Sequence, residues 1–244
     1  MQLLVSVRDS EDATAALAGG ADLIDVKDPA KDALGAADID QFREVMATIA
    51  GVCPVTAALG DAIDAEQAGA IAAQFASAGA TFVKIGFKGI NDVPRIHEML
   101  TSIIRSLRSA GAETGVVAVA YAESVAAERI PLLTLIEAAA CAGARGVLVD
   151  TMDKSGPGLR DLLPRGALMR WAEAAHDAQL LFSVAGRLTE HDIEFARSTG
   201  ADIAGVRSAV CEGGRSGPVV VDRVRRLRAL CSTSTLDAAQ PSAL

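Results

Sequence analysis

Aromatic residues are scarce in this sequence and make up only 3% of its 244 residues. The hydrophobic half of the chain therefore consists mostly of Ala, Val, Leu and Ile, the aliphatic side chains that fill layered α/β cores. No uninterrupted apolar run reaches membrane-spanning length, and no basic segment with a cleavage site opens the chain. These absences argue against a membrane-spanning helix and a signal peptide, and we expect a cytoplasmic protein.

Positive charge is also in the minority, with 23 Lys and Arg against 31 Asp and Glu and a formal net charge of −8. This balance argues against nucleic acid or an anionic membrane as a partner, although local cations still allow a small anionic ligand. Cys53, Cys141, Cys211 and Cys231 lie far apart and form no CxxC pair, so no metal site is predicted. We expect them to be buried or partly buried free thiols in a reducing compartment.

The chain does contain a regular alternation of short apolar strands and amphipathic helices. Strands are predicted at residues 3–7, 23–27, 54–58, 81–86, 116–120, 146–150, 180–185 and 203–206, and a helix follows each of them. This count and the length favour an α/β fold, a (β/α)8 TIM barrel, as one catalytic domain over residues 1–231. A doubly wound open sheet is the alternative. Residues 232–244 are small and polar and are predicted to be a disordered tail.

A short phrase precedes several of these strands. Gly-Ala-Asp occurs at residues 20–22 and 200–202, and Gly-Ala-Thr at 79–81. Because glycine readily ends a helix, the repetition predicts a shared helix-to-strand turn and not tandem domains. Asp38 with Gln41 has the spacing of a helix N-cap, which supports the helix placed after residue 38.

Charged residues stand at the ends of several predicted strands. Side chains alternate faces along a strand, so Asp25 and Lys27 point the same way. Lys84 lies near the end of the fourth strand, Asp150 ends the sixth, and Lys154 follows four residues later. The carboxyl ends of parallel strands share one face of a barrel, and buried Lys and Asp are unusual unless paired. Their convergence predicts a functional site.

The residue types at these ends indicate a chemistry. Burial and neighbouring cations lower the pKa of a lysine amine and free its lone pair to attack a carbonyl. Lys27 and Lys84 are close enough in this scheme to lower each other's pKa. Asp25 and Asp150 would then transfer protons, as an imine-forming site requires. A strand-end lysine that is merely ion-paired is the alternative interpretation.

The last two predicted strands add a candidate anion site. Gly186 follows the seventh strand, Arg207 and Ser208 follow the eighth, and Gly213 and Gly214 lie farther along the same loop. The loops after strands seven and eight commonly bind phosphate in TIM barrels. Arg215 is expected to be a solvated loop residue.

Other candidates are weaker. Tyr121 ends the fifth strand and either faces the mouth or lies on its rim, while His97, His176 and His191 lie on predicted helices. The sequence has no Walker loop, no GxGxxG after a strand and no Ser-His-Asp order, so no cofactor or metal is predicted.

Taken together, these residues resemble one family, (5-formylfuran-3-yl)methyl phosphate synthase of methanofuran biosynthesis. The phrases that carry the resemblance span nearly the whole chain in order. They are residues 3–6, 18–22, 24–27, 34–36, 83–86, 150–151 with Lys154, and 205–207 with Cys211 and 213–214. The most specific is Asp-Val-Lys at 25–27 with its upstream Gly-Gly-Ala-Asp. The departure from the family is Arg8, where a neutral residue is common; a phosphate contact and a surface charge are its alternative roles.

The resemblance implies a cofactor-free barrel lyase that condenses two molecules of glyceraldehyde 3-phosphate to a furan aldehyde phosphate. It implies Lys27 as the Schiff-base lysine and Lys84 as the proton acceptor, supported by Asp25, Asp150 and Lys154. Two alternatives stay open at this point. One is a class I aldolase or isomerase acting on triose phosphates, and the other is a non-catalytic barrel that binds phosphorylated metabolites. A homo-oligomer is expected because barrels often self-associate.

Overall fold

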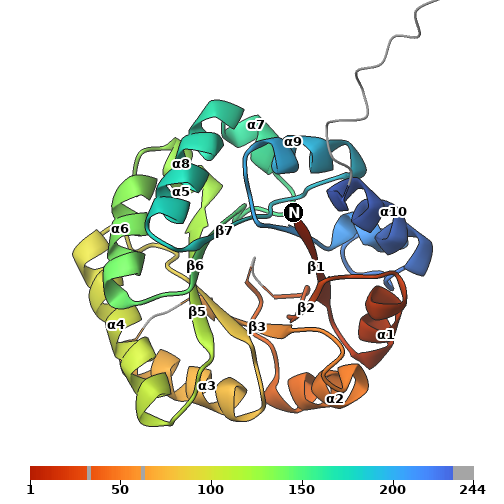
Figure 1. Ribbon diagram of the computed structural model, residues 1–244, viewed down its shortest axis with the longest axis horizontal. Helices are drawn as coiled ribbons and strands as arrows, with labels where there is room; N and C mark the ends of the chain where they lie inside the picture. The colour runs from red at the N-terminus through yellow and green to blue at the C-terminus, as the bar shows by residue number, and fades with distance from the viewer. Residues whose placement is uncertain (32–33, 62–63, 233–244) are drawn as a thin grey trace, which may run out of the picture.

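The computed structural model describes residues 1–31, 34–61 and 64–232. Eight parallel strands pair in sequence order and close into a barrel, because β1 also pairs with β8 (Figure 1). The strands are β1 (Gln2–Val7), β2 (Leu23–Val26), β3 (Val55–Asp61), β4 (Phe82–Gly86), β5 (Gly115–Tyr121), β6 (Gly146–Asp150), β7 (Leu181–Val184) and β8 (Ile203–Val206). The predicted TIM barrel is therefore confirmed, and the open-sheet alternative is wrong.

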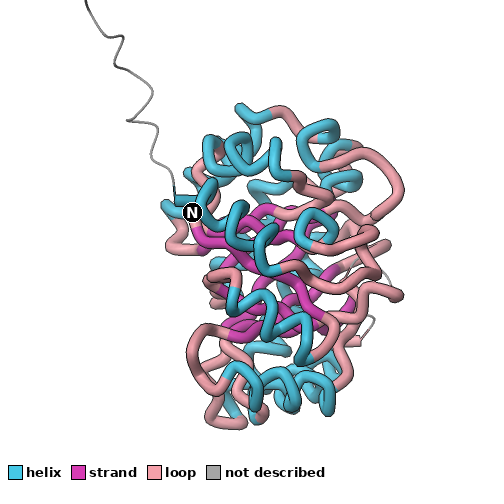
Figure 2. Tube along the Cα trace, turned by 90° about the vertical axis from the view of Figure 1, so that its right-hand side faces the viewer, coloured by secondary structure: helices cyan, strands magenta, loops and turns pink. Residues whose placement is uncertain are grey.

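Helices surround the strands on the outside of the barrel (Figure 2). The α-helices are α1 (Ser10–Ala18), α2 (Ile39–Ile49), α3 (Ala65–Ser77), α4 (Val93–Ser109), α5 (Ala122–Ala126), α6 (Leu132–Ala142), α7 (Leu159–Leu162), α8 (Arg165–Asp177), α9 (Ile193–Ser198) and α10 (Val221–Ser232). Two short 3₁₀ helices are η1 (Glu190–Asp192) and η2 (Ser208–Val210). None of the helices in the described ranges is long and apolar enough to cross a membrane.

The large core lies between the strands and the helices and is almost wholly aliphatic. On α4, Ile96, Leu100, Ile103 and Leu107 form one buried stripe, as their spacing predicts. The rings of Phe42 and Phe75 meet edge to face between α2 and α3, with their centroids 5.1 Å apart. Aliphatic side chains, many of them branched, therefore fill this layer, and few aromatic residues are needed in it.

Alternation along the strands divides the barrel interior into an apolar floor and a polar mouth. Leu4, Leu23 and Ile203 pack together in the floor, with Phe82 beside them. Two residues farther along β2, the side chain at position 25 is a carboxylate with no solvent exposure. The direction of the strands therefore places apolar residues at one end and charged residues at the other.

The repeated Gly-Ala-Asp phrase forms the predicted helix-to-strand turn. Gly20 and Gly200 both adopt positive φ, +86° and +83°, a conformation that glycine accepts without steric cost. The following aspartates hold the neighbouring strands, because Asp22 accepts from the Leu3 backbone N–H at 2.7 Å and Asp202 from that of Phe182 at 2.8 Å. These turns lie at the amino ends of the strands, where they stabilise the barrel away from the site.

Several predicted boundaries need correction. The single helix predicted after the sixth strand is two helices, α7 and α8, because Pro164 cannot donate an intrahelical hydrogen bond. The short helix α5 was missed, since only five residues form it. Ser232, assigned to the tail, is the last residue of α10, and residues 233–244 lie outside the described part of the chain.

Candidate active site

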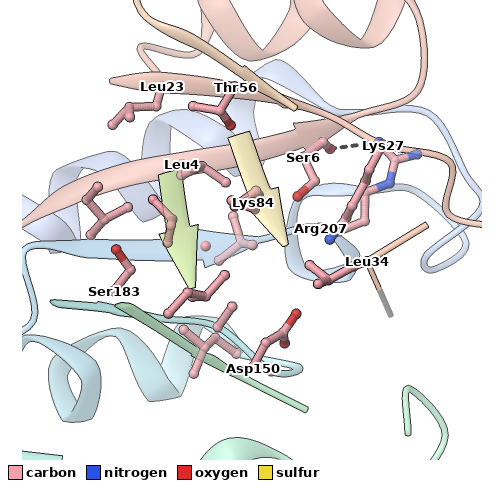
Figure 3. Close-up of a pocket in the computed structure, with 18 of the residues that line it drawn as sticks. Leu4, Ser6, Leu23, Lys27, Leu34, Thr56, Lys84, Asp150, Ser183 and Arg207 are labelled. Atoms are coloured by element: carbon pink, nitrogen blue, oxygen red, sulfur yellow. Dashed lines mark hydrogen bonds between the residues drawn. The ribbon is translucent and has the colours of Figure 1, made fainter. Parts of the chain in front are cut away.

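One cavity opens at the carboxyl ends of the strands, and residues from all eight strands or their loops line it (Figure 3). Lys27, Lys84, Asp150 and Lys154 are among these residues, so the structure brings together these charged groups predicted at the strand ends and in the loop after β6. In Figure 3 the labelled Lys27, Lys84 and Asp150 point into the same space from different strands. Asp25 is fully buried and is not part of the cavity wall.

Lys84 in the cavity wall forms a buried ion pair with Asp25, which lies behind the wall. The Lys84 Nζ lies 2.6 Å from Asp25 Oδ1, and both side chains are less than a tenth exposed. Two hydroxyls complete the carboxylate's shell, because Thr56 donates to Oδ1 at 2.8 Å and Ser6 donates to Oδ2 at 3.0 Å. Asp25 is therefore satisfied from three strands, and Lys84 is held in a fixed position at the cavity edge.

A second ion pair lies across the mouth. The Lys154 Nζ donates to Asp150 Oδ1 and to the Thr151 carbonyl, each at 2.6 Å. Burial disfavours the charged form of Asp150, but attraction to Lys154 and then Lys27 outweighs it and lowers the Asp150 pKa. The carboxylate therefore stays ionised at neutral pH.

Lys27 is different from the other two lysines. It follows β2 directly, and its side chain makes neither a salt bridge nor a hydrogen bond to any described residue, although only 8% of it is exposed. Burial lowers its pKa from the ordinary 10.5 to about 7, and repulsion from Lys84 and Lys154 acts in the same direction. Attraction to Asp25 and Asp150 opposes the shift without cancelling it.

The charges in the site balance when Lys27 is neutral. Asp25 pairs with Lys84 and Asp150 pairs with Lys154, so two anions already have two cations. A third ammonium would be an uncompensated buried charge, which proteins avoid by releasing the proton. A neutral lysine amine with a free lone pair is the form that attacks a carbonyl.

The loop that carries Lys154 has a support that sequence analysis missed. The Glu123 carboxylate on α5 accepts from the backbone N–H of Met152 at 2.9 Å and of Asp153 at 3.0 Å. These contacts fix the start of the loop after β6 and thereby the position of Lys154. The acidic residue stands 29 positions before Met152 with no recognisable motif, so only the fold shows the connection.

Arg207 lines the cavity, but its guanidinium group forms hydrogen bonds with other parts of the protein. Its Nε donates to the Arg215 carbonyl, its Nη2 to the Gly217 carbonyl, and its Nη1 to the Ser6 carbonyl and the Asp12 carboxylate at 2.7 Å. All three guanidinium nitrogens are thus already engaged. Arg207 ties the loop after β8 to β1 and α1, and its role in phosphate binding stays a prediction.

Asp12 is the centre of this cluster. Besides Arg207 it accepts from Arg8 Nε at 2.9 Å and from the Val219 backbone N–H at 2.8 Å. Burial opposes ionisation of Asp12, yet these donors lower its pKa. Arg8 also donates to the Ser216 carbonyl, so it anchors the same loop, which matches neither the phosphate contact nor the free surface charge considered for it.

Replacing Asp12 by Asn should lower the free energy of unfolding by about 2 kcal/mol at pH 7, because two guanidinium groups lose their anion. A carboxylate with a depressed folded pKa stabilises the protein above its unfolded pKa, near 4, and loses this contribution as pH falls through the folded value. The difference from wild type should therefore shrink below about pH 4. Urea unfolding at several pH values measures it, and a difference that stays constant with pH would contradict the ion-pair account.

The other residues predicted to bind phosphate divide into two groups. Gly186 and Ser208 line the cavity. Gly186 has φ +109°, and a Cβ there would meet the Thr151 side chain at 2.8 Å, so glycine is required where the loops after β6 and β7 approach. Gly213 and Gly214 do not line the cavity. Both adopt positive φ in the loop after β8, and their role in phosphate binding stays a prediction.

Two further arginines belong to the cavity wall. Arg187 follows Gly186 and adopts positive φ of +55°. Arg215 was expected to be solvated, but it is partly buried and lines the cavity, so that expectation is wrong. The reason is tertiary, because its Nε donates to the Pro29 carbonyl of the loop after β2 at 3.1 Å.

The remaining candidates lie outside the cavity wall. Tyr121 is buried and its hydroxyl donates to Asp61 at 2.6 Å, so it braces the ends of β3 and β5. His176 pairs with Asp202 at the other end of the barrel. Cys211 and Cys231 are buried as expected, whereas Cys141 is exposed on α6.

Comparison with known sequences identifies one group of relatives. Residues 3–228 match the family model described as 4-HFC-P synthase. The (5-formylfuran-3-yl)methyl phosphate synthase of Methanosarcina mazei is 37% identical over 232 residues, covering 95% of this chain and 99% of its own. The enzyme of the same name from Archaeoglobus fulgidus is 35% identical and covers 93% and 97%. A putative one from Streptomyces griseus is 34% identical and covers 88% and 87%.

Solved structures with a similar fold are more distant in sequence. The 3-hexulose-6-phosphate synthase of Salmonella typhimurium aligns with a TM-score of 0.65 at 18% identity, over 95% of this chain and 98% of that one. Deoxyribose phosphate aldolase from Aeropyrum pernix aligns with a TM-score of 0.64 at 15% identity, over 95% and 90%. At this level of identity the likeness supports the barrel fold alone.

Proposed function

The chain belongs to the 4-HFC-P synthase family, and from this premise we propose that it condenses two molecules of glyceraldehyde 3-phosphate to (5-formylfuran-3-yl)methyl phosphate. The reaction releases one phosphate and two waters, and it would serve the biosynthesis of a methanofuran-type cofactor. The observation that carries the mechanism is the unpaired Lys27 amine, whose pKa is about 7, between two complete ion pairs. In this proposal the enzyme is a Schiff-base-forming lyase.

Lys27 starts the reaction. Its neutral amine attacks the aldehyde carbon of one triose phosphate, and the carbinolamine loses water to give a protonated imine. The imine draws electrons from the neighbouring carbon, so a proton leaves from that carbon and an enamine forms. The enamine then makes the new carbon–carbon bond to the second triose phosphate. Attack by a hydroxyl oxygen closes the ring, phosphate departs with its bonding electrons, and further loss of water and of the lysine leaves the aromatic furan.

Proton transfer falls to the groups that face the cavity. Lys84, Asp150 and Lys154 line it and can reach substrate atoms. Asp25 has no exposed surface and no place in the cavity wall, so we assign it a positioning role, in which it fixes the Lys84 amine. This assignment separates the two aspartates that the sequence treated alike.

Substrate phosphate groups would bind on the side of the mouth formed by the last two strands. Gly186 and Ser208 offer backbone and hydroxyl donors there, and the adjoining Arg187 adds positive charge. The two lysine–carboxylate pairs are electrically neutral, so the attraction for a dianion comes from this side.

The dependence of kcat/KM on pH should follow Lys27. Imine formation needs the neutral amine, so kcat/KM should rise about tenfold per pH unit below the Lys27 pKa and level off above about 7. Initial rates of furan formation at pH 5.5 to 9 measure this profile. A profile that is flat below pH 7 would contradict the assignment of Lys27 as the group that must lose a proton.

The direct test is mass spectrometry of the protein incubated with glyceraldehyde 3-phosphate and sodium borohydride. We expect a reduced adduct on Lys27 and a furan phosphate in the unreduced mixture. An adduct with only triose products would favour an aldolase or isomerase instead. Absence of an adduct on every lysine would remove the imine mechanism and favour a phosphometabolite-binding barrel.

A further inference from the structure

Arg215 has an unused donor inside the cavity. Its Nε is engaged by the Pro29 carbonyl, but its Nη2 is buried and has no hydrogen-bond partner among the described residues. A buried donor left unpaired costs about 1 to 3 kcal/mol, and more when it belongs to a charged group. Such a group in a cavity wall points to a ligand that completes it.

The charge of Arg215 is also uncompensated among the described residues. It forms no salt bridge with any described carboxylate, and burial lowers its pKa. The neighbouring Arg207 repels it, whereas Asp150 attracts it from a distance but is paired with Lys154. An anion with several acceptor oxygens best supplies both the charge and the hydrogen-bond acceptors that this partly buried guanidinium lacks.

The contact with Pro29 gives the group a defined place. Pro29 is two residues beyond Lys27, so the guanidinium lies across the mouth from the loop after β8 to the end of β2. A phosphate bound there would belong to a molecule whose carbonyl carbon is near the Lys27 amine. By contrast, every guanidinium nitrogen of Arg207 already donates a hydrogen bond within the protein, and the Arg187 side chain is exposed.

From these contacts we propose that the Arg215 guanidinium binds the phosphate group of a triose phosphate in this cavity and thereby selects phosphorylated substrates. This inference rests on the proposed function for the identity of the substrate, but phosphate recognition itself does not require the imine chemistry. The bond is a charge-assisted hydrogen bond from Nη2 to a phosphate oxygen, with Nε remaining on Pro29.

The experiment compares wild type with Arg215→Met by calorimetric titration with sn-glycerol 3-phosphate, which carries the phosphate but has no carbonyl to form an imine. The affinity should fall by about 10- to 100-fold in Arg215→Met, the range expected for loss of a hydrogen bond to a charged group. Arg226→Met is the matched control, because Arg226 is an exposed arginine on α10. It removes the same charge and should change the affinity less than twofold.

A second readout separates phosphate binding from general damage to the site. Borohydride trapping on Lys27 should slow in Arg215→Met with glyceraldehyde 3-phosphate but stay unchanged with glyceraldehyde. An equal loss with both aldehydes would overturn the proposal, as would unchanged binding of sn-glycerol 3-phosphate. If Arg215→Met does not fold, Arg215→Lys takes its place, with about tenfold weaker binding expected and equal binding overturning the proposal.

The outcomes also separate this inference from the proposed function. Binding of sn-glycerol 3-phosphate that depends on Arg215, together with no imine and no furan from wild type, would support phosphate recognition and remove the synthase proposal. Furan formation by Arg215→Met with the wild-type KM would leave the synthase proposal standing and overturn the role of Arg215. Failure of wild type to bind sn-glycerol 3-phosphate would also overturn that role.

Discussion

Replacing Lys27 by Met should reduce furan formation by at least about a thousandfold, the scale seen when a covalent nucleophile is removed. The borohydride-trapped adduct should disappear from the protein as well. Methionine keeps nearly the length and the apolar stem of lysine but has no nucleophilic nitrogen, so the cavity retains its shape. The measurements are initial rates with glyceraldehyde 3-phosphate and peptide mass spectrometry after reduction.

The same variant should be more stable than wild type at pH 7, by about 2 to 4 kcal/mol. The folded pKa of Lys27 lies near 7, below the ordinary 10.5, so the folded protein holds fewer protons than the unfolded chain between these values. Wild-type stability therefore rises with pH across this window, and the unfavourable contribution is fully present below pH 7. The methionine variant lacks this contribution at every pH.

The pH dependence is the internal control for this prediction. The stability difference between Lys27→Met and wild type should be largest below pH 7 and fade toward pH 10.5, as measured by guanidinium unfolding. The Lys27→Met substitution should therefore lower activity and raise stability. This is expected for a residue that serves the reaction at a cost to the stability of the folded protein. A variant that is inactive and also less stable would contradict the assignment of Lys27 as a strained, unpaired amine.

Removing one partner of the Lys84–Asp25 pair should be the most destabilising change in the site. Lys84→Met leaves the buried Asp25 carboxylate with only the hydroxyls of Ser6 and Thr56, and Asp25→Asn leaves the buried Lys84 ammonium without its anion. Each single variant should lose about 3 to 5 kcal/mol of unfolding free energy. Urea unfolding at pH 7 measures the loss, and furan formation should fall with it.

The double variant shows whether the two losses have one cause. Asp25→Asn with Lys84→Met removes both charges, so it should be clearly more stable than the sum of the single losses predicts. The coupling energy of the cycle should be at least about 1 kcal/mol. Arg226→Met, at an exposed arginine on α10, is the control and should change stability by less than about 0.5 kcal/mol. Additive losses would mean that the two side chains act independently.

The sequence alone determined the barrel and the position of its chemistry. Aliphatic strands alternate with capped helices, and this periodicity is local, so it can be read without any contact information. Lys27 and Asp150 stand at or just beyond strand ends, and Asp25 and Lys84 lie one and two residues before them. Parallel strands of one barrel bring their carboxyl ends to the same face. The barrel topology therefore brings Lys27, Lys84 and Asp150 to one cavity, with Asp25 behind its wall.

Only the tertiary structure decided which of these groups are paired, which is unpaired and which face the cavity. Which lysine is paired depends on distances across the barrel. Lys84 forms a salt bridge with Asp25, whereas Lys27 forms none with a carboxylate of the described residues. Asp25 lies behind the wall because Ser6 and Thr56 enclose it from neighbouring strands. Alternation along one strand cannot reveal such enclosure.

The loops show the same limit most clearly. Arg207 was a candidate ligand because it ends β8, yet its nitrogens hold the loop through contacts about 200 residues apart in sequence. Arg215 was set aside as a loop residue, yet a carbonyl 186 residues away draws it over the cavity. A loop side chain takes its role from the partners that the closed barrel brings to it, and no local pattern in the sequence encodes those partners.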